Sequence, residues 1–556
     1  MTRPNGGDLL VETLRALGVD TVFGIVSVHN LPLVEAVDRD LRFVPVRHEA
    51  AAVNAADGYA RATGNLGCAL TSTGTGAGNA AGSLIESLSS GTPVLHVTGQ
   101  IDSEYLGSGR GFIHETKDQL GMLRAVSTHA VTVTDAASAG DILRDAAARA
   151  LTAPHGPVSV EWPIDLQFAP QRLTGTPVPK PATPALPDPA LLDEAAALLS
   201  AARRPLVWAG GGAHTARPEL TALLDALNAG LVTSNSGRGS VPESDDRVLG
   251  NYATAPAGRA LLAEADVLLS IGTHFRSNET ADYSLGLPPV HIQLDLDPAA
   301  PGRVYPATVA LHGDATAVLA ALLGRVTSGA TETSWPARVR KARTDARNAQ
   351  RHAIGPQAAI NDAIRDACPP GSVIARDVTI PSSTWGNRLL EITDPATNVF
   401  PRGGGIGQGL AMGIGAALGR PGTPTVVIAG DGGLAVHLGE LLTLAQEKPD
   451  LTLLVFNDGG YGVLRNMQDN HFPRRSGVDL TTPDFALLAA ATGLPYARIA
   501  AEADAGPVIK EAIASPGPTL VEIDLTALGP MNTPFTPPVK LPATAADTSG
   551  QGGNPS

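Results

Sequence analysis

The stretch Ala429-Gly430-Asp431-Gly432-Gly433 ends one apolar run of the chain, and Asn457-Asp458-Gly459-Gly460-Tyr461-Gly462 ends the next. The first run, 425–428, predicts a buried strand, and 434–447 carries leucines at helical spacing. The second run, 451–456, predicts another strand. Strand, helix and strand form a βαβ unit, so both aspartates are expected at the carboxyl ends of neighbouring parallel strands. Open α/β sheets bind their ligands at that edge.

The residue types at these two turns suit a metal and a phosphate. Two carboxylates and the carbonyls of a glycine-rich turn are oxygen ligands for Mg²⁺, which usually shares its shell with waters and phosphate oxygens. Gly432 and Gly433 let backbone N–H groups approach an anion without a Cβ in the way. The alternative is a pair of ordinary strand-end turns, where Asp-Gly sequences are common.

The two turns together resemble the cofactor motif of thiamine-diphosphate-dependent enzymes, the group of acetolactate synthase, benzoylformate decarboxylase and benzaldehyde lyase. The resemblance extends over residues 8–530. It implies Mg²⁺ ligands from Asp431, Asp458 and the carbonyl of Gly460. It also implies thiamine diphosphate beside these ligands and beside Gly432, Gly433, Tyr461 and Gly462. The second ligand is usually Asn in the family, so Asp458 is a departure that adds a negative charge.

A second motif, Arg47-His48-Glu49, follows the apolar run 43–46 and opens a small-residue helix, 50–63. On the residues alone, an acid in the first turn of a helix is favoured by the helix dipole. With Ala56-Asp57-Gly58-Tyr59-Ala60-Arg61, however, the stretch resembles the family signature whose Glu is catalytic. The resemblance implies that Glu49 bonds N1′ of the thiamine pyrimidine and drives it to the imino form, which deprotonates C2. A dry pocket would raise the pKa of such a carboxyl so that it can hold the proton.

The stretch 71–79 predicts a glycine-rich turn that opens a helix. It does not fit GxGxxG, which disfavours a nicotinamide site. Ser72 stands where benzoylformate decarboxylase carries a catalytic His, so a proton relay copied from that enzyme does not apply. His29 and His114 are the candidates to replace it facing the substrate. The alternative is that each is a hydrogen-bonded structural residue.

Before the metal turn, 403–409 resembles the family's turn under the bend of the cofactor. The resemblance implies that Ile406 holds thiamine in its V shape and that the carbonyl of Gly404 accepts from the 4′-amino group. Thr379 and Ile380 are expected near the diphosphate. The alternative for Ile406 is a place in the core. Arg402 and Arg465 could receive an anionic substrate tail or lie on the surface.

Size and composition predict an α/β enzyme of three doubly wound, Rossmann-like domains, each with a mostly parallel sheet. At 556 residues the chain is too long for one core. The expected domains are an N-terminal pyrimidine-binding domain, a central Rossmann-like domain, a C-terminal diphosphate- and Mg-binding domain and a loose tail, at 1–172, 188–330, 355–530 and 531–556. Six prolines in 177–189 predict a stiff linker, and 335–352 a basic helical connector.

The central domain is predicted from apolar runs at 205–209, 267–271 and 290–294. Some relatives bind FAD in this domain, and others leave it empty. Gly210-Gly211-Gly212 and 236–239 are too generic to decide. We expect a structural domain without flavin.

A net charge of −14 gives no basic surface for nucleic acid or for an anionic membrane. The two cysteines, Cys68 and Cys368, fit no metal spacing and indicate a reducing compartment. The N-terminus lacks the apolar core of a signal peptide, and no apolar run approaches membrane-spanning length. These features predict a soluble, cytoplasmic protein.

The leading prediction is a thiamine-diphosphate- and Mg²⁺-dependent 2-oxo acid decarboxylase, similar to benzoylformate decarboxylase, with possible carboligase activity. A carboligase similar to acetolactate synthase and a lyase of 2-hydroxy ketones or 2-hydroxyacyl-CoA are alternatives. An FAD-dependent 2-oxo acid oxidase is a further class, and a non-catalytic subunit conflicts with Glu49, Asp431 and Asp458. The resemblance also implies a homodimer or homotetramer with each active site between two chains.

Overall fold

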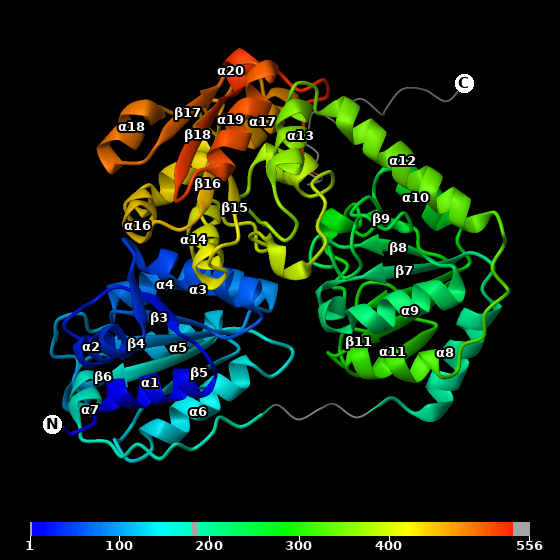
Figure 1. Ribbon diagram of the computed structural model, residues 1–556. Helices are drawn as coiled ribbons and strands as arrows, with labels where there is room; N and C mark the ends of the chain where they lie inside the picture. The colour runs from blue at the N-terminus through cyan, green and yellow to red at the C-terminus, as the bar shows by residue number, and fades with distance from the viewer. Residues whose placement is uncertain (1–2, 181–185, 538–556) are drawn as a thin grey trace, which may run out of the picture.

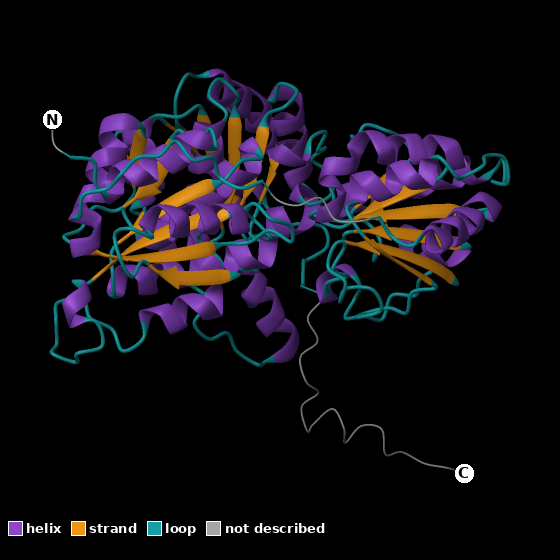
Figure 2. Cartoon of the chain, turned by 90° about the horizontal axis from the view of Figure 1, so that it is seen from below, coloured by secondary structure: helices purple, strands orange, loops and turns teal. Residues whose placement is uncertain are grey.

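The computed structural model describes residues 3–180 and 186–537, so part of the proline linker and most of the predicted tail lie outside it. Three sheets, each of six parallel strands, follow one another along the chain (Figure 1). Helices cover both faces of each sheet (Figure 2). The predicted fold class, three α/β units, is confirmed, and the sheets are parallel throughout rather than mostly so.

The first sheet has the strand order β2-β1-β3-β4-β6-β5. The chain leaves β1 toward one side and returns to β3 on the other, so the turns after these two strands flank the switch point where ligands bind. The strands are β1 (Thr21–Gly24), β2 (Arg42–Pro45), β3 (Gly67–Thr71), β4 (Val94–Gln100), β5 (His129–Thr132) and β6 (Val158–Pro163). The helices are α1 (Gly6–Ala16), α2 (Leu31–Asp40), α3 (Glu49–Thr63), α4 (Thr75–Ser90), α5 (Gln119–Val126), α6 (Ala139–Ala150) and α7 (Ile164–Phe168).

The second sheet has the order β12-β11-β10-β7-β8-β9, with its switch point between β7 and β10. There Gly212 donates its N–H to the carbonyl of Gly272 at 3.2 Å, and a Cβ on Gly210 would stand 2.1 Å from the same oxygen. Close packing of two turns therefore explains these glycines. The elements are α8 (Pro189–Ala201), β7 (Pro205–Ala209), α9 (Arg217–Leu227), β8 (Gly230–Thr233), β9 (Val248–Gly250), α10 (Pro256–Glu264), β10 (Val267–Ile271), β11 (Val290–Asp295), β12 (Val309–His312) and α11 (Ala315–Leu323).

The third sheet has the order β14-β13-β15-β16-β18-β17, and its switch point lies between β13 and β15. Its strands are β13 (Val373–Arg376), β14 (Asn398–Val399), β15 (Thr425–Gly430), β16 (Leu451–Asn457), β17 (Tyr496–Ile499) and β18 (Thr519–Asp524). Its helices are α13 (Gln357–Ala367), α14 (Gly409–Gly419), α15 (Asp431–Leu434), α16 (Glu440–Glu447), α17 (Gly462–His471), α18 (Phe485–Thr492), α19 (Glu502–Ala514) and α20 (Leu525–Leu528).

The helix predicted over 434–447 is broken. Helical geometry begins earlier, at Asp431, passes through a 3₁₀ turn at Ala435–His437 and resumes in α16. Gly439 precedes α16, and glycine is among the poorest helix formers. The leucine spacing predicted the buried face only in part, because Leu441 is buried whereas Leu442 is 47% exposed, and it could not show this break.

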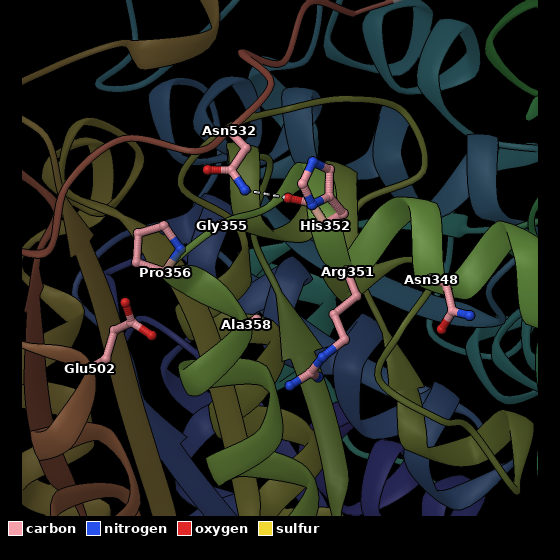
Figure 3. A pocket seen from close by; sticks show the side chains of 8 residues that line it. All are labelled: Asn348, Arg351, His352, Gly355, Pro356, Ala358, Glu502 and Asn532. Atoms are coloured by element: carbon pink, nitrogen blue, oxygen red, sulfur yellow. Dashed lines mark hydrogen bonds between the residues drawn. The ribbon is translucent and has the colours of Figure 1, made fainter.

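The second and third sheets are joined by α12 (Trp335–Ala353), and Gly355, two residues after its end, has φ of +56°. A recess of about 530 Å³ lies at this joint and is lined from α12, α13, α19 and Asn532 (Figure 3). Asn532 donates to the carbonyl of His352 at 2.7 Å. None of the predicted site residues lines this recess. None of the described helices has the length and apolarity to cross a membrane.

The first and third sheets meet through α3 and α14, which share one apolar cluster. A Cβ on Gly58 would stand 2.0 Å from the carbonyl oxygen of Met412. A Cβ on Gly415 would stand 1.8 Å from the carbonyl oxygen of Ala55. The two helices therefore touch backbone to backbone, which only glycine permits at these positions.

Candidate active site

Two carboxylates meet at the carboxyl end of the third sheet. β15 and β16 pair in parallel with Gly430 opposite Phe456, so Asp431 and Asp458 emerge from adjacent strands. Asp431 is 2% exposed and accepts a hydrogen bond from Gly459 N–H at 3.0 Å. The Oδ1 atom of Asp458 is buried and has no hydrogen-bond partner among the described residues. Burying a carboxylate oxygen that has no partner costs free energy unless a cation binds it.

The electrostatics of this pair suit a divalent cation. Burial raises the pKa of Asp458 to about 6, and the nearby charge of Asp431 adds to the shift. Burial also raises the pKa of Asp431. A hard cation between the two would offset both the burial and the repulsion. No cluster of three His, Cys, Asp or Glu side chains suited to a metal occurs in 3–180 or 186–537, so further ligands would be carbonyl, water or phosphate oxygens.

Glycines shape the rest of this edge. The carbonyl oxygen of Gly460 lies 2.9 Å from where a Cβ on Gly432 would stand, so the third predicted ligand faces the first turn. A Cβ on Gly462 would stand 2.1 Å from Oδ2 of Asp458 and 3.2 Å from the side chain of Ile380. A Cβ on Gly430 would approach the hydroxyl of Thr379 at 3.0 Å. These predicted cofactor residues therefore share one small region.

The turn 403–409 is fastened to this region by Asp377, which follows β13. Its carboxylate accepts backbone N–H groups of Val378 at 2.6 Å, Gly407 at 3.1 Å and Gly409 at 3.4 Å. Burial raises the pKa of Asp377 to about 6. Ile406, at the centre of the turn, is 38% exposed rather than part of the core. Its side chain is free to support a ligand above the turn.

Glu49 begins α3 at the corresponding edge of the first sheet. Its Oε2 accepts from the side-chain amide of Asn79 at 3.0 Å, and Gly76 leaves room for its Oε1. The residue is half-buried. Directly before it, the ring of His48 lies 5.2 Å, centroid to centroid, from that of His437, which follows the Asp431 turn in the chain. This ring contact joins the first and third domains of one chain beside the residue that precedes Glu49.

His29 and His114 are brought together. Their Nδ1 atoms lie 3.4 Å apart, and His29 is 3% exposed. Burial lowers the pKa of His29, and His114 contributes to the shift. A Cβ on Gly74 would strike the carbonyl of His114 at 2.2 Å, so the pair rests on the same turn whose Gly76 faces Glu49.

Both arginines considered for an anionic tail form hydrogen bonds within the protein, but the buried Nε of Arg402 has no hydrogen-bond partner among the described residues. Arg465 donates to Asp479 at 2.8 Å and to the carbonyl of Asp458 at 3.2 Å. Arg402 donates to the carbonyl of Ser90 at 2.9 Å. Both side chains stabilise loops around the site.

Sequence reasoning missed Glu86, a residue of α4 that is 2% exposed. Its carboxylate accepts the backbone N–H groups of Arg402 and Gly403 at 2.6 Å each and the hydroxyl of Ser90 at 2.6 Å. It therefore holds the start of the 403–409 turn from the first domain. The only sequence signal was an acid among the small and apolar residues of a helix.

Replacing Glu86 with alanine is expected to weaken cofactor binding by about tenfold or more and to lower the thermal midpoint. Two backbone N–H groups would lose their acceptor, at about 1–3 kcal/mol each. Glutamine keeps one acceptor oxygen and should have a smaller effect. Calorimetric titration with thiamine diphosphate, with exposed Glu104→Ala as control, measures the difference. Equal affinity in the alanine variant and the unmodified protein would contradict this positioning role.

The comparisons with known proteins agree with this geometry. Three family models match the chain: the thiamine pyrophosphate enzyme N-terminal TPP binding domain at 4–122, the central domain at 192–322 and the C-terminal TPP binding domain at 381–523. The chain belongs to the thiamine pyrophosphate (thiamine diphosphate) enzyme family.

Among its relatives, a protein named "Probable 2-ketoarginine decarboxylase" from Pseudomonas aeruginosa is 35% identical over 495 residues, covering 88% of each chain. The acetolactate synthase isozyme 2 large subunit of Escherichia coli is 30% identical, covering 96% of this chain and 98% of that one. A "Probable acetolactate synthase large subunit" from Methanocaldococcus jannaschii is 29% identical over 93% of this chain and 91% of its own. The predicted family and enzyme class are confirmed.

Proposed function

We propose that this chain is a thiamine-diphosphate- and Mg²⁺-dependent 2-oxo acid decarboxylase. The observation that carries the proposal is the meeting of Asp431, Asp458 and the 403–409 turn at one sheet edge. Bound thiamine diphosphate supplies a carbon nucleophile and an electron sink. Asp431, Asp458 and the Gly460 carbonyl would hold Mg²⁺.

The remaining residues would orient the cofactor and move protons. Thr379, Gly432 and Gly433 lie where diphosphate oxygens would meet the metal edge, and Ile406 would support the bend. Glu49 would hold a proton at N1′ of the pyrimidine. The placement of these residues and the family membership support this assignment.

Release of a free aldehyde, rather than transfer to a second carbonyl, is favoured by the paired histidines. The Nδ1 atoms of His29 and His114 lie 3.4 Å apart, beside the turn at Gly74. Such a pair can hand a proton to a carbon that has lost CO₂. The relative named as a decarboxylase is consistent with this outcome. A carboligase remains the second candidate, because several relatives are named acetolactate synthase.

We also propose that a second copy of the chain completes the site. Ile406 is 38% exposed and Val436, beside the cofactor turn, is 49% exposed. Val28 next to His29 is also exposed. Apolar side chains left open around a catalytic edge are typical of a surface that another chain covers.

Product analysis over a panel of 2-oxo acids tests the proposed function. With thiamine diphosphate and Mg²⁺ present, we expect CO₂ release with an equal amount of free aldehyde, detected by mass spectrometry. A condensed product in place of the aldehyde would establish the carboligase. Absence of CO₂ from every acid, with cofactor binding shown by calorimetry, would overturn the decarboxylation proposal.

A further inference from the structure

Each histidine of the pair rests against a glycine at the carboxyl edge of the first sheet. A Cβ on Gly99, in β4, would stand 2.3 Å from the carbonyl oxygen of His29. A Cβ on Gly74 would stand 2.2 Å from the carbonyl oxygen of His114, and Gly74 has φ of +63°, a conformation that favours glycine. The spacing of the two imidazole rings therefore depends on where these two glycine backbones lie.

A single buried side chain, that of Gln119 at the start of α5, bonds both glycines. Its Oε1 accepts the backbone N–H of Gly74 at 2.7 Å, and its Nε2 donates to the carbonyl of Gly99 at 3.2 Å. Gln119 is 3% exposed. One amide group thus connects the turn that supports His114 to the strand that supports His29.

The buried carboxylate of Glu161, in β6, fixes the orientation of this amide. Its Oε2 accepts from Nε2 of Gln119 at 3.1 Å and from Nε2 of Gln100 at 3.2 Å. A carboxylate accepts hydrogen bonds and donates none, so the NH₂ of Gln119 must face it and the amide oxygen must face the turn. Gln100 ends β4 and Gln119 begins α5, so Glu161 holds both ends of the segment 101–118, which carries His114.

We propose that Gln119, oriented by Glu161, is a positioning residue that sets the spacing between His29 and His114. The inference rests on the proposed decarboxylation, because the pair would give its proton to the carbon that has lost CO₂. A general acid must lie within hydrogen-bond reach of the atom that it protonates, and misplacement by about 1 Å can lower a rate 10²-fold. With the pair displaced, that carbon would persist longer without a proton and would react more often with a second carbonyl. Gln119 therefore biases the reaction toward the free aldehyde.

Gln119→Met tests this role, because methionine keeps the length of the side chain and removes both hydrogen-bonding groups. The assay uses the 2-oxo acid of the panel that releases CO₂ fastest, with acetaldehyde added as the second carbonyl. The ratio of free aldehyde to condensed product should fall about 10- to 100-fold. An unchanged ratio would overturn the proposal.

Gln357→Met is the matched control, since this buried glutamine accepts from the indole N–H of Trp385 at 2.9 Å in the third domain. Its product ratio should match that of the unmodified protein, because a loss of folded protein lowers both products alike. A fall in this ratio as large as that in Gln119→Met would show that any buried defect changes the products, and it would overturn the positioning role.

Two variants of Glu161 test whether its carboxylate orients the amide. The hydroxyl of Thr132 donates to Oε1 of Glu161 and can equally accept, so in Glu161→Gln the new NH₂ can face Thr132 while the oxygen faces Gln119. This variant should keep the product ratio. Glu161→Leu leaves the amide of Gln119 without its acceptor and should lower the ratio as Gln119→Met does. Equal ratios in Glu161→Leu and the unmodified protein would overturn the orienting role of Glu161.

Crystal structures of the variants give a readout that does not depend on turnover. In Gln119→Met we expect the Nδ1 atoms of His29 and His114 to move apart by about 1 Å, the misplacement on which the rate argument depends. In Glu161→Gln they should stay at the 3.4 Å of the unmodified protein. Separation of the histidines in Gln119→Met supports the positioning role even if no 2-oxo acid is decarboxylated and the proposed function fails. A pair that stays together in Gln119→Met overturns the positioning role and leaves the proposed function standing.

Discussion

Glu49→Gln is expected to lower CO₂ release from a 2-oxo acid by about 10²- to 10⁴-fold, the usual contribution of a positioned acid–base group. The amide cannot give a proton to N1′ of the pyrimidine as a carboxylic acid can. Its oxygen can still accept from Asn79, whose amide lies 3.0 Å from the carboxylate, so the start of α3 should keep its conformation. The measurement is initial CO₂ release at saturating thiamine diphosphate and Mg²⁺.

The control for this variant is Glu35→Gln, which removes a carboxylate of the same domain that is paired with Arg39 on the surface. Its rate should match that of the unmodified protein. Thermal melting of both variants excludes loss of fold. If Glu49→Gln retained the full rate, the role of Glu49 in proton transfer to the pyrimidine would have to be abandoned.

Asp431→Asn is expected to weaken the Mg²⁺-dependent binding of thiamine diphosphate by about 10²- to 10³-fold. A carboxylate near a cation is worth a few kcal/mol at an intermediate dielectric, and 1.4 kcal/mol is a factor of ten. Asparagine keeps the oxygen that accepts from Gly459 and removes the charge. Calorimetric titration of the cofactor at a series of Mg²⁺ concentrations measures the loss.

Two further variants sharpen this result. Asp458→Asn retains a ligand oxygen and relieves the repulsion between the two acids, so its effect should be smaller than that of Asp431→Asn. Asp469→Asn changes an exposed acid paired with Arg475 in the same domain and should have no effect. Equal cofactor affinity in Asp431→Asn and the unmodified protein would rule out this edge as the metal site.

The variants Glu49→Gln and Asp431→Asn also test whether a second copy of the chain completes the site. If each site combines Glu49 of one chain with Asp431 of another, a mixed dimer of Glu49→Gln and Asp431→Asn chains has one intact site and one doubly altered site. Unfolding and refolding the two variants together should then restore part of the activity. Activity that stays at the level of the separate variants, with mixed dimers demonstrated, would place both residues of each site in one chain.

The sequence predicted the placement of Asp431 and Asp458 because βαβ geometry constrains where a residue directly after a strand must lie. The glycine-rich turns were visible for the same reason, since Gly at such positions reflects close approach of backbone. The family motifs added Glu49, whose local sequence alone also suited an ordinary helix start. Short-range geometry and motif spacing thus predicted most of the candidate residues at the carboxyl edge of the third sheet.

Glu86 could not be predicted, because its role depends on how the first and third domains pack. Glu86 meets Arg402 across 316 positions of sequence, and a single acid on a helix has no periodic signal. The break in the helix after Asp431 was missed because leucine spacing reports a buried face and not the continuity of the backbone.

The backbone contact between α3 and α14 has a mechanical consequence. Glu49 begins α3 and the turn that carries Ile406 precedes α14, so both predicted parts of the site start from helices that touch backbone to backbone. Because the backbones touch at Gly58 and Gly415, we expect little sliding of these two helices past each other. We therefore expect the movements that admit substrate and release product to occur away from this joint.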